Sequence, residues 1–251
     1  MRHDADLRLA HELADAADAV TLGSFRSRDL RVDSKPDLTP VSEADLAAER
    51  VIRTLVAQRR PGHAVLGEEF GEEDAAARWI VDPIDGTRNY VRGIPVWATL
   101  LALELDGSIE VALVSAPALA RRWWAVRGEG AWVDGSRCGV SQVTALADGV
   151  VSTSSAPGMP DGWATLAASA WSSRAFGDFW QHCLVAEGSI EVATDAELEL
   201  WDYAAIRLLV EEAGGRCTTF SGGAPTPGGS FVSTNGRLHD DVLSALGGGA
   251  S

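Results

Sequence analysis

An apolar run at residues 78–81 leads directly into Asp82–Thr87, which has the sequence DPIDGT. The apolar run predicts a buried strand. Pro83 predicts that this strand ends at Asp82, because proline has no amide donor for a strand ladder and pushes the preceding residue away from helical angles. The fold must therefore bury one strand and deliver a polar turn at its end.

The turn brings hard oxygen ligands close to a candidate anion site. Asp82 and Asp85 are three residues apart, so both carboxylates and the Ile84 carbonyl can face one point. Three such oxygens suit Mg²⁺. Gly86 and Thr87 can begin a helix, whose free N–H groups and positive dipole end would hold a phosphate there. The same residue types also form ordinary turns and helix caps, so a purely structural role is an alternative.

Length and charge limit the class of protein. The chain has 251 residues, of which 46% are hydrophobic, so it can bury a sizeable core as one large domain or two interlocked halves. Its formal net charge is −15. A nucleic-acid or anionic membrane partner would need a basic face, so we expect neither. A bound cation or a positively charged small molecule is easier to accommodate.

The three cysteines, Cys138, Cys183 and Cys217, are widely spaced and form no C-x-x-C pair. They predict buried thiols in a reducing cytoplasm rather than a disulfide framework or a zinc site. The first residues contain no long apolar core and no run reaches 18 apolar residues, so we expect neither a signal peptide nor a membrane span. The glycine-rich stretch 247–251 is expected to be a flexible tail.

Hydrophobic periodicity divides the chain near residue 145 into an antiparallel half and an alternating α/β half that should share one core. In the first half we expect a helix at 6–28, a loop or hairpin at 30–40, a helix from Ser42 to about Arg60, a strand at 63–69, an antiparallel meander at 96–105, 109–114 and 122–126, and a hairpin at 128–135. In the second half we expect strands at 150–154, 174–177, 190–193, 216–220 and 231–233, and helices at 161–171, 178–187, 200–213 and 237–246.

Acidic residues recur at the ends of these elements. They are Asp45, Glu68, Asp82, Asp85 and Asp202. Each could be a cap or turn residue by itself. If they converge, their mutual repulsion implies divalent cations. Two metal ions about 4 Å apart would polarise a phosphoryl group and lower the pKa of a bound water, which is the chemistry of phosphate-ester hydrolysis.

Thr87 and Asp45 can complete such a site. The Thr87 hydroxyl can orient the water, with Asp45 as its proton acceptor and general base, although a plain helix-cap hydroxyl is an alternative for Thr87. The chain contains no Gly-x-Ser-x-Gly elbow, Walker loop or dinucleotide-binding glycine pattern after a strand, so rival chemistries lack their usual motifs. His63 and His182 are expected in the core or on the surface.

Three stretches, Gly67–Glu69, Trp79–Tyr90 and Trp201–Ala205, resemble the inositol-monophosphatase superfamily in content and in order. The resemblance implies an α+β fold, layered as an α-β-α-β-α sandwich, and a Mg²⁺-dependent phosphomonoesterase that forms a homodimer. By position, the implied metal ligands are Glu68, Asp82, the Ile84 carbonyl, Asp85 and Asp202. The implied catalytic residues are Asp45, Thr87 and Glu68, and the phosphate would bind at Asp85, Gly86 and Thr87.

Within the superfamily, Arg88–Ala98, residues 35–42 and Gly177–Trp180 resemble bacterial histidinol-phosphate phosphatases of histidine biosynthesis. Histidinol phosphate carries an ammonium group and an imidazole, with which Asp178 and Asp195 could pair. Alternatively, Asp178 caps its helix and Asp195 is a loop acid. Arg88 and Arg92 could be surface cations or ion-pair partners.

The sequence therefore predicts a phosphomonoesterase, with two or three Mg²⁺ or alternatively Mn²⁺, that releases phosphate from L-histidinol phosphate by direct attack of an activated water. An inositol-1-phosphate or broad sugar-phosphate phosphatase is an alternative of the same fold. A non-catalytic metal-binding interaction module is an alternative of another class.

Overall fold

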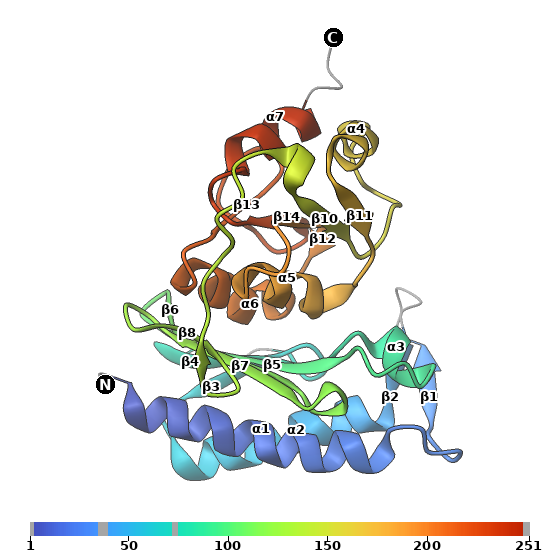
Figure 1. Ribbon diagram of the computed structural model, residues 1–251. Helices are drawn as coiled ribbons and strands as arrows, with labels where there is room; N and C mark the ends of the chain where they lie inside the picture. Colours follow the sequence, from blue (N-terminus) through green and yellow to red (C-terminus); the bar gives the residue numbers. More distant parts are fainter. Residues whose placement is uncertain (1–2, 35–39, 72–74, 248–251) are drawn as a thin grey trace.

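The computed structural model describes residues 3–34, 40–71 and 75–247. Within them the chain forms five layers, in which two pairs of helices enclose two sheets and a third pair lies between the sheets (Figure 1). The α-β-α-β-α sandwich predicted from the sequence is confirmed. The N-terminal pair of helices packs on the first sheet. The pair that includes the last helix packs on the second sheet, at the opposite end of the molecule.

The first layer is made by the N-terminal helices and a short hairpin. Its elements are α1 (Asp4–Ser24), β1 (Val32–Ser34), β2 (Pro40–Ser42) and α2 (Glu43–Arg59). α1 ends four residues before the predicted Arg28. β1 and β2 pair antiparallel, so the predicted loop or hairpin is a hairpin in its described part, while residues 35–39 lie outside the described residues.

The first sheet follows the chain order β3-β4-β5-β6-β7-β8-β9. Its strands are β3 (Ala64–Gly67), β4 (Ala77–Asp85), β5 (Ala98–Leu105), β6 (Ser108–Ala116), β7 (Arg121–Val126), β8 (Gly130–Val133) and β9 (Ser136–Arg137), with α3 (Thr87–Val91) after β4 and the 3-10 turn η1 (Pro117–Leu119) after β6. β3 and β4 are parallel and the later pairs antiparallel, so the predicted meander is confirmed.

The end predicted for the central strand is wrong. β4 does not stop at Asp82 but continues through Pro83 to Asp85. The pairing with β5 shifts register between Asp82, opposite Leu100, and Asp85, opposite Ala98. This irregularity accommodates Pro83, because a bulged residue does not need a ladder donor. The Thr99 hydroxyl donates to the Pro83 carbonyl at 2.8 Å and holds the bulge in place.

The second half alternates strands and helices as predicted. Its elements are the 3-10 turn η2 (Leu146–Asp148), β10 (Val150–Thr153), α4 (Gly162–Ser169), β11 (Ser172–Arg174), α5 (Asp178–Ala186), β12 (Val192–Leu198), α6 (Leu200–Glu212), β13 (Arg216–Thr218), β14 (Gly229–Thr234) and α7 (His239–Gly247). The strand order is β11-β10-β12-β14-β13. Two predicted strands were misplaced. β11 ends at Arg174, where the predicted strand 174–177 begins, and β12 runs five residues past the predicted end at Ala193.

The main core lies between the sheets. α6 packs against β4–β7 on one side and against β13 and β14 on the other, and α5 lies beside it. Trp123 of the first sheet contacts Phe179 of α5 edge to face, with ring centroids 6.1 Å apart. Cys183 and Cys217 are buried free thiols, as predicted, whereas Cys138 is only partly buried. The shared core fixes the position of one half against the other.

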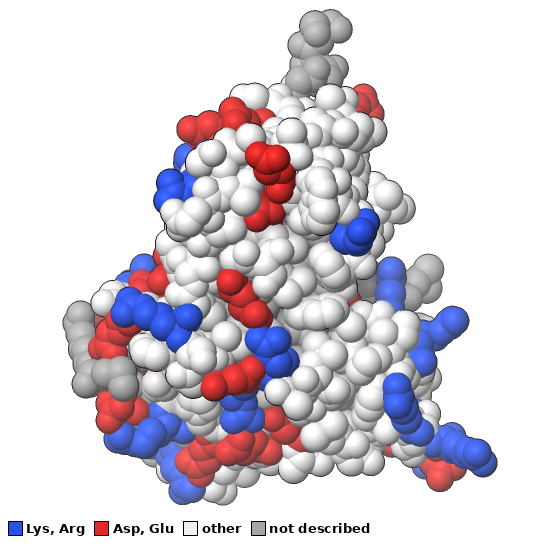
Figure 2. All heavy atoms as spheres, in the orientation of Figure 1, with Lys and Arg blue, Asp and Glu red and all other residues white. Residues whose placement is uncertain are grey.

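The face shown in Figure 2 carries acidic and basic side chains interspersed over the lower layers. Oppositely charged side chains also pair directly, as Arg122 does with Asp15 at 2.7 Å and with Asp18 at 2.6 Å. Along the described stretches of chain, every helix is too short or too polar to cross a membrane. The predicted tail beyond Gly247 lies outside the described residues.

Candidate active site

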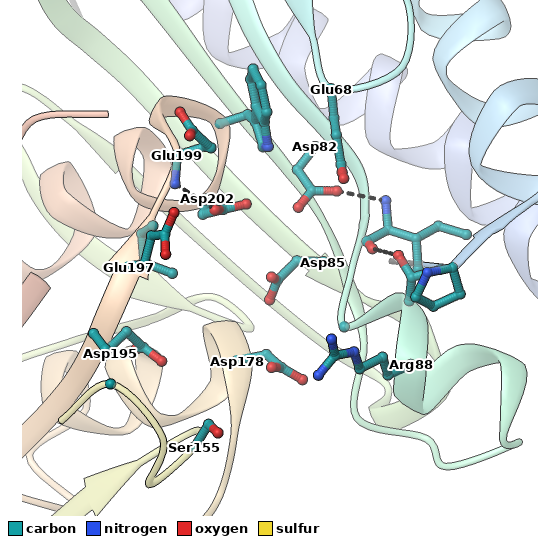
Figure 3. A pocket seen from close by; sticks show the side chains of 18 of the residues that line it. Glu68, Asp82, Asp85, Arg88, Ser155, Asp178, Asp195, Glu197, Glu199 and Asp202 are labelled. Atoms are coloured by element: carbon teal, nitrogen blue, oxygen red, sulfur yellow. Dashed lines mark hydrogen bonds between the residues drawn. The ribbon is translucent and has the colours of Figure 1, made fainter. Parts of the chain in front are cut away.

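A cleft of about 1010 Å³ lies where the two halves meet (Figure 3). Its walls come from the end of β4 and the start of α3 on one side, and from β12 and the starts of α5 and α6 on the other. The cleft is large enough for a small ester. Its lining is rich in carboxylates, namely Glu68, Asp82, Asp85, Asp178, Asp195, Glu197, Glu199 and Asp202.

Three of these acids converge at the floor of the cleft. Asp82 and Asp85 of β4 and Asp202 of α6 each offer a carboxylate oxygen, and these oxygens lie within 4.8 Å of one another. Burial raises the pKa of Asp82 and of Asp85 well above the ordinary value, and neighbouring carboxylates raise both further. The same causes, burial first, raise the pKa of Asp202 to about 7. A divalent cation would relieve this repulsion, so the donor set fits Mg²⁺.

The Asp82–Asp85 turn is held by hydrogen bonds on both sides. The Ile84 amide donates to Asp82 Oδ1 at 2.9 Å. The Asp85 carboxylate accepts a hydrogen bond of 2.7 Å from the amide of Phe179, at the start of α5. The second bond joins residues far apart in sequence, so the position of Asp85 depends on the docking of the two halves.

Asp202 is both a helix cap and a member of the carboxylate cluster. Its Oδ2 accepts a 2.7 Å hydrogen bond from the amide of Glu199. Glu199 immediately precedes α6, and Glu199 and Asp202 together form a capping box. A carboxylate has two oxygens and several lone pairs, so the cap does not prevent metal binding. The structural and functional alternatives considered for Asp202 are therefore compatible.

Glu68 lies just beyond the end of β3 and lines the same cleft. Figure 3 shows it beside Asp82. Its charge is the largest contribution from a neighbouring group to the raised pKa of Asp82, after burial. The three-acid cluster therefore has a fourth carboxylate next to it, as predicted from the sequence.

Asp45 is fully buried and lies behind Thr87 rather than in the lining of the cleft. The Thr87 hydroxyl lies 3.2 Å from Asp45 Oδ1 and 3.0 Å from the Ile84 carbonyl, and both can accept its proton. Asp45 also closes a capping box with Ser42 at the start of α2. Burial raises the pKa of Asp45. Any contact between Asp45 and a ligand would run through the Thr87 hydroxyl.

Gly86 is required by the backbone and by its neighbours. Its φ is +83°, and a Cβ there would lie 3.0 Å from both Asp178 Oδ2 and the Val96 carbonyl. An L side chain in this left-handed conformation costs about 1–2 kcal/mol before any crowding. The chain therefore passes the predicted phosphate site with no side chain at this position.

We expect Gly86→Ala to destabilise the protein and to weaken the binding of inorganic phosphate by about tenfold, since the amides of the first turn of α3 would shift. Gly135→Ala is the matched control, because Gly135 has a similar φ of +85° with open space around it. Gly135→Ala should lower the free energy of unfolding and leave phosphate binding unchanged. Product inhibition by phosphate measures the effect, and equal inhibition constants in the two variants would contradict this role of Gly86.

The structure corrects the structural alternatives considered for Asp178 and Asp195. Asp178 is the first residue of α5, with φ +43°, and its side chain does not cap that helix. Asp195 is not a loop acid but lies in β12. Both line the cleft. Asn89 Nδ2 donates to Asp178 Oδ2 at 2.9 Å, and burial followed by the charge of Asp195 raises the pKa of Asp178 to about 6.

Four polar or charged residues of the lining were not predicted to contact the substrate. Glu197, Glu199 and Ser155 line the cleft, and so does Arg88, whose role the sequence left open. The charge of Arg88 lowers the pKa of Asp178, which places it near that carboxylate, whereas Arg92 is exposed and lies outside the lining. Asp195 and Glu197 lie in β12 and Glu199 precedes α6. A register shift between Asp195 and Leu198 brings the intervening Ala196 and Leu198 into the lining as well, so simple alternation along a strand could not have identified these acids.

The inositol monophosphatase family matches the chain over residues 4–247. A histidinol-phosphatase of Mycobacterium tuberculosis is 51% identical to it over 99% of this chain and 100% of its own length. A histidinol-phosphatase of Streptomyces coelicolor is 50% identical over 96% of each chain. Among solved structures, that of extragenic suppressor protein suhB from Bartonella henselae is 31% identical and covers 98% of this chain and 100% of its own, with a TM-score of 0.91.

Proposed function

Because the chain belongs to the inositol monophosphatase family, we propose that it is a Mg²⁺-dependent phosphomonoesterase that hydrolyses L-histidinol phosphate to L-histidinol and phosphate. One observation carries the proposal above the others. The converging carboxylates of Asp82, Asp85 and Asp202 open into the same cleft as Asp178 and Asp195. A site for hard cations therefore lies beside a site for a positively charged organic group.

The acids at the floor of the cleft would hold the metal. The proposed ligands of two or three Mg²⁺, or alternatively Mn²⁺, are Glu68, Asp82, the Ile84 carbonyl, Asp85 and Asp202. Bound divalent cations supply electrophilic polarisation of a phosphoryl oxygen and lower the pKa of water. Burial, and after it the charges of neighbouring carboxylates, raises the pKa of Asp202, and a bound cation would offset both effects, which supports this assignment.

The turn after β4 would bind the phosphate and direct the proton. The phosphate would lie at Asp85, Gly86 and Thr87, where main-chain N–H groups of the turn donate to its oxygens. The Thr87 hydroxyl would accept a hydrogen bond from the attacking water and pass a proton toward Asp45, 3.2 Å away. Asp45 would thus be the terminal proton acceptor, and Glu68 would support the same step.

The far end of the cleft favours a cationic leaving group. Asp178 and Asp195 would contact the ammonium and imidazole of histidinol phosphate, and the nearby Glu197 and Glu199 add negative potential. Inositol and sugar phosphates carry hydroxyls instead of these cations, so they would leave the buried acids poorly paired. This contrast favours histidinol phosphate over the alternative substrates.

We also propose that residues 1–251 form one phosphatase domain that works as a homodimer in the cytoplasm, with a small phosphate monoester as its partner and without nucleic acid or membrane. The single-domain proposal is supported by the site itself. Asp82 and Asp85 come from one half and Asp202 from the other, so neither half alone has the full donor set.

A substrate comparison tests the proposal. Phosphate release should be fastest from L-histidinol phosphate and slower from myo-inositol 1-phosphate and fructose 1,6-bisphosphate, and it should require Mg²⁺ in every case. A preference for inositol 1-phosphate would replace the proposed substrate with the first alternative. Folded protein that binds Mg²⁺ but releases phosphate from none of the three would favour a metal-binding module.

A further inference from the structure

A buried histidine stands directly behind Asp195. His182 of α5 is fully buried, and its Nε2 lies 2.8 Å from Asp195 Oδ2. Its Nδ1 lies 2.7 Å from the Ser233 hydroxyl of β14. The imidazole also packs against Phe231 at right angles, with centroids 5.1 Å apart. The two hydrogen bonds and the ring contact therefore hold the imidazole in one orientation.

The partners of His182 fix the direction of one of its hydrogen bonds. The Asp195 carboxylate can only accept a hydrogen bond, so Nε2 must carry the proton that lies between them. Nδ1 faces the Ser233 hydroxyl, which can either accept a hydrogen bond or donate one. This arrangement resembles a Ser-His-Asp triad, but Ser233 is fully buried in β14 and cannot reach a substrate. His182 therefore orients Asp195 and does not activate Ser233.

A second donor reinforces the same carboxylate oxygen. Gln181 Nε2 donates to Asp195 Oδ2 at 2.7 Å, while Gln181 Oε1 accepts from the Ser152 hydroxyl at 2.7 Å. Both Gln181 and His182 are fully buried. One oxygen of Asp195 is thus occupied from inside the protein, which leaves Oδ1 for a ligand. Figure 3 shows the Asp195 side chain directed into the cleft.

We propose that His182 is a positioning residue that fixes the Asp195 carboxylate so that Oδ1 receives the ammonium group of the substrate. The inference rests on the proposed function and deepens it, because it assigns the recognition of the amino group to a buried pair. Without the histidine, Asp195 could rotate away or lose its charge-assisted partner, and a cationic ester would lose its advantage over a neutral one. The chemistry at phosphorus would not change.

Two esters that differ by one amino group provide the test. They are L-histidinol phosphate and 3-(imidazol-4-yl)propyl phosphate, which lacks the amine. For the unmodified protein, kcat/KM should favour the amino ester. His182→Leu should reduce this preference by about tenfold or more, through KM, while kcat for the ester without the amine stays near its starting value. His182→Gln, which keeps an amide donor, should recover part of the preference.

Two further variants make the result specific. Asp195→Asn should lose the preference as well, and the double variant with His182→Leu should lose no more than Asp195→Asn alone, since both act on one contact. His239→Gln is the matched control. His239 is another fully buried histidine that bonds two hydroxyls, those of Thr218 and Thr234, away from the cleft. It should lower the melting temperature without changing the preference.

The outcomes separate the two proposals. If the unmodified protein hydrolyses both esters equally well, or neither, the substrate assignment fails and this inference fails with it. If it favours the amino ester and His182→Leu keeps that preference, only the positioning role is overturned. An equal loss of kcat/KM for both esters in His182→Leu, with the melting temperature lowered as in His239→Gln, would show a purely structural role and would also overturn it.

Discussion

Asp82→Asn should lower kcat for L-histidinol phosphate by about 10³-fold or more at saturating Mg²⁺. Asp82 is almost fully buried and shares the floor of the cleft with Asp85 and Asp202. An amide of the same shape removes one negative charge and one anionic ligand. Losing several kcal/mol of charge stabilisation at the phosphoryl group corresponds to a rate loss of this size.

The same variant should fold, and without metal it should be more stable than the unmodified protein at pH 8. The physical reason is that the substitution removes a buried charge that Glu68, Asp85 and Asp202 repel. Thermal unfolding with EDTA and with Mg²⁺ measures both effects, and the stabilisation by Mg²⁺ should largely disappear. Asp241→Asn, on the exposed side of α7, is the control and should behave like the unmodified protein. Near-normal turnover in Asp82→Asn would refute its role as a ligand.

Removing the metal should destabilise the protein strongly at pH 8 and only weakly at pH 5. Without metal, the pKa of Asp178 is about 6 and that of Asp202 about 7, both raised chiefly by burial. In an unfolded chain the pKa of aspartate is about 3.9. Between about pH 4 and pH 7 the folded state therefore keeps protons that the unfolded state has released, so the free energy of unfolding of the metal-free protein falls as the pH rises.

The size of this pH dependence follows from the difference between the pKa of Asp202 in the folded and in the unfolded chain. Each proton retained by the folded state contributes about 1.4 kcal/mol per pH unit, so Asp202 alone accounts for about 4 kcal/mol by pH 8, or a melting temperature lower by about 10 °C. Mg²⁺ neutralises the cluster and should flatten this dependence. Melting curves from pH 5 to pH 8, with EDTA or Mg²⁺, test it, and Asp202→Asn should show a shallower slope. A metal-free protein that gains stability from pH 5 to pH 8 would contradict the assignment.

Local chemistry predicted most of the elements and the nature of the site. Helical spacing located α1, α2, α5 and α6 to within a few residues, because the buried face of a helix repeats along the chain. The DPIDGT turn indicated a cation site next to an anion site before any tertiary contact was known. The roles of its residues stay predictions, but the structure places Asp82, Asp85 and Asp202 together, as the sequence suggested.

The errors lie where distant segments decide the backbone. Pro83 was expected to end its strand, yet β4 continues because the register shift against β5 removes the need for a ladder donor. β12 was expected to end at Ala193, although pairing with β14 carries it to Leu198. Both corrections depend on a partner strand that is remote in sequence, and no local pattern encodes which residue will stand opposite.

The sequence by itself determined which residues could be ligands, caps and buried faces, since these properties belong to residue types and to their spacing. Only the tertiary structure decided that Asp45 reaches the cleft through Thr87, that Asp202 closes the carboxylate cluster, and that His182 stands behind Asp195. The reason is physical. The three contacts join α2 to α3, α6 to β4 and α5 to β12, and the direction of each side chain is set by the packing of these elements rather than by its neighbours along the chain.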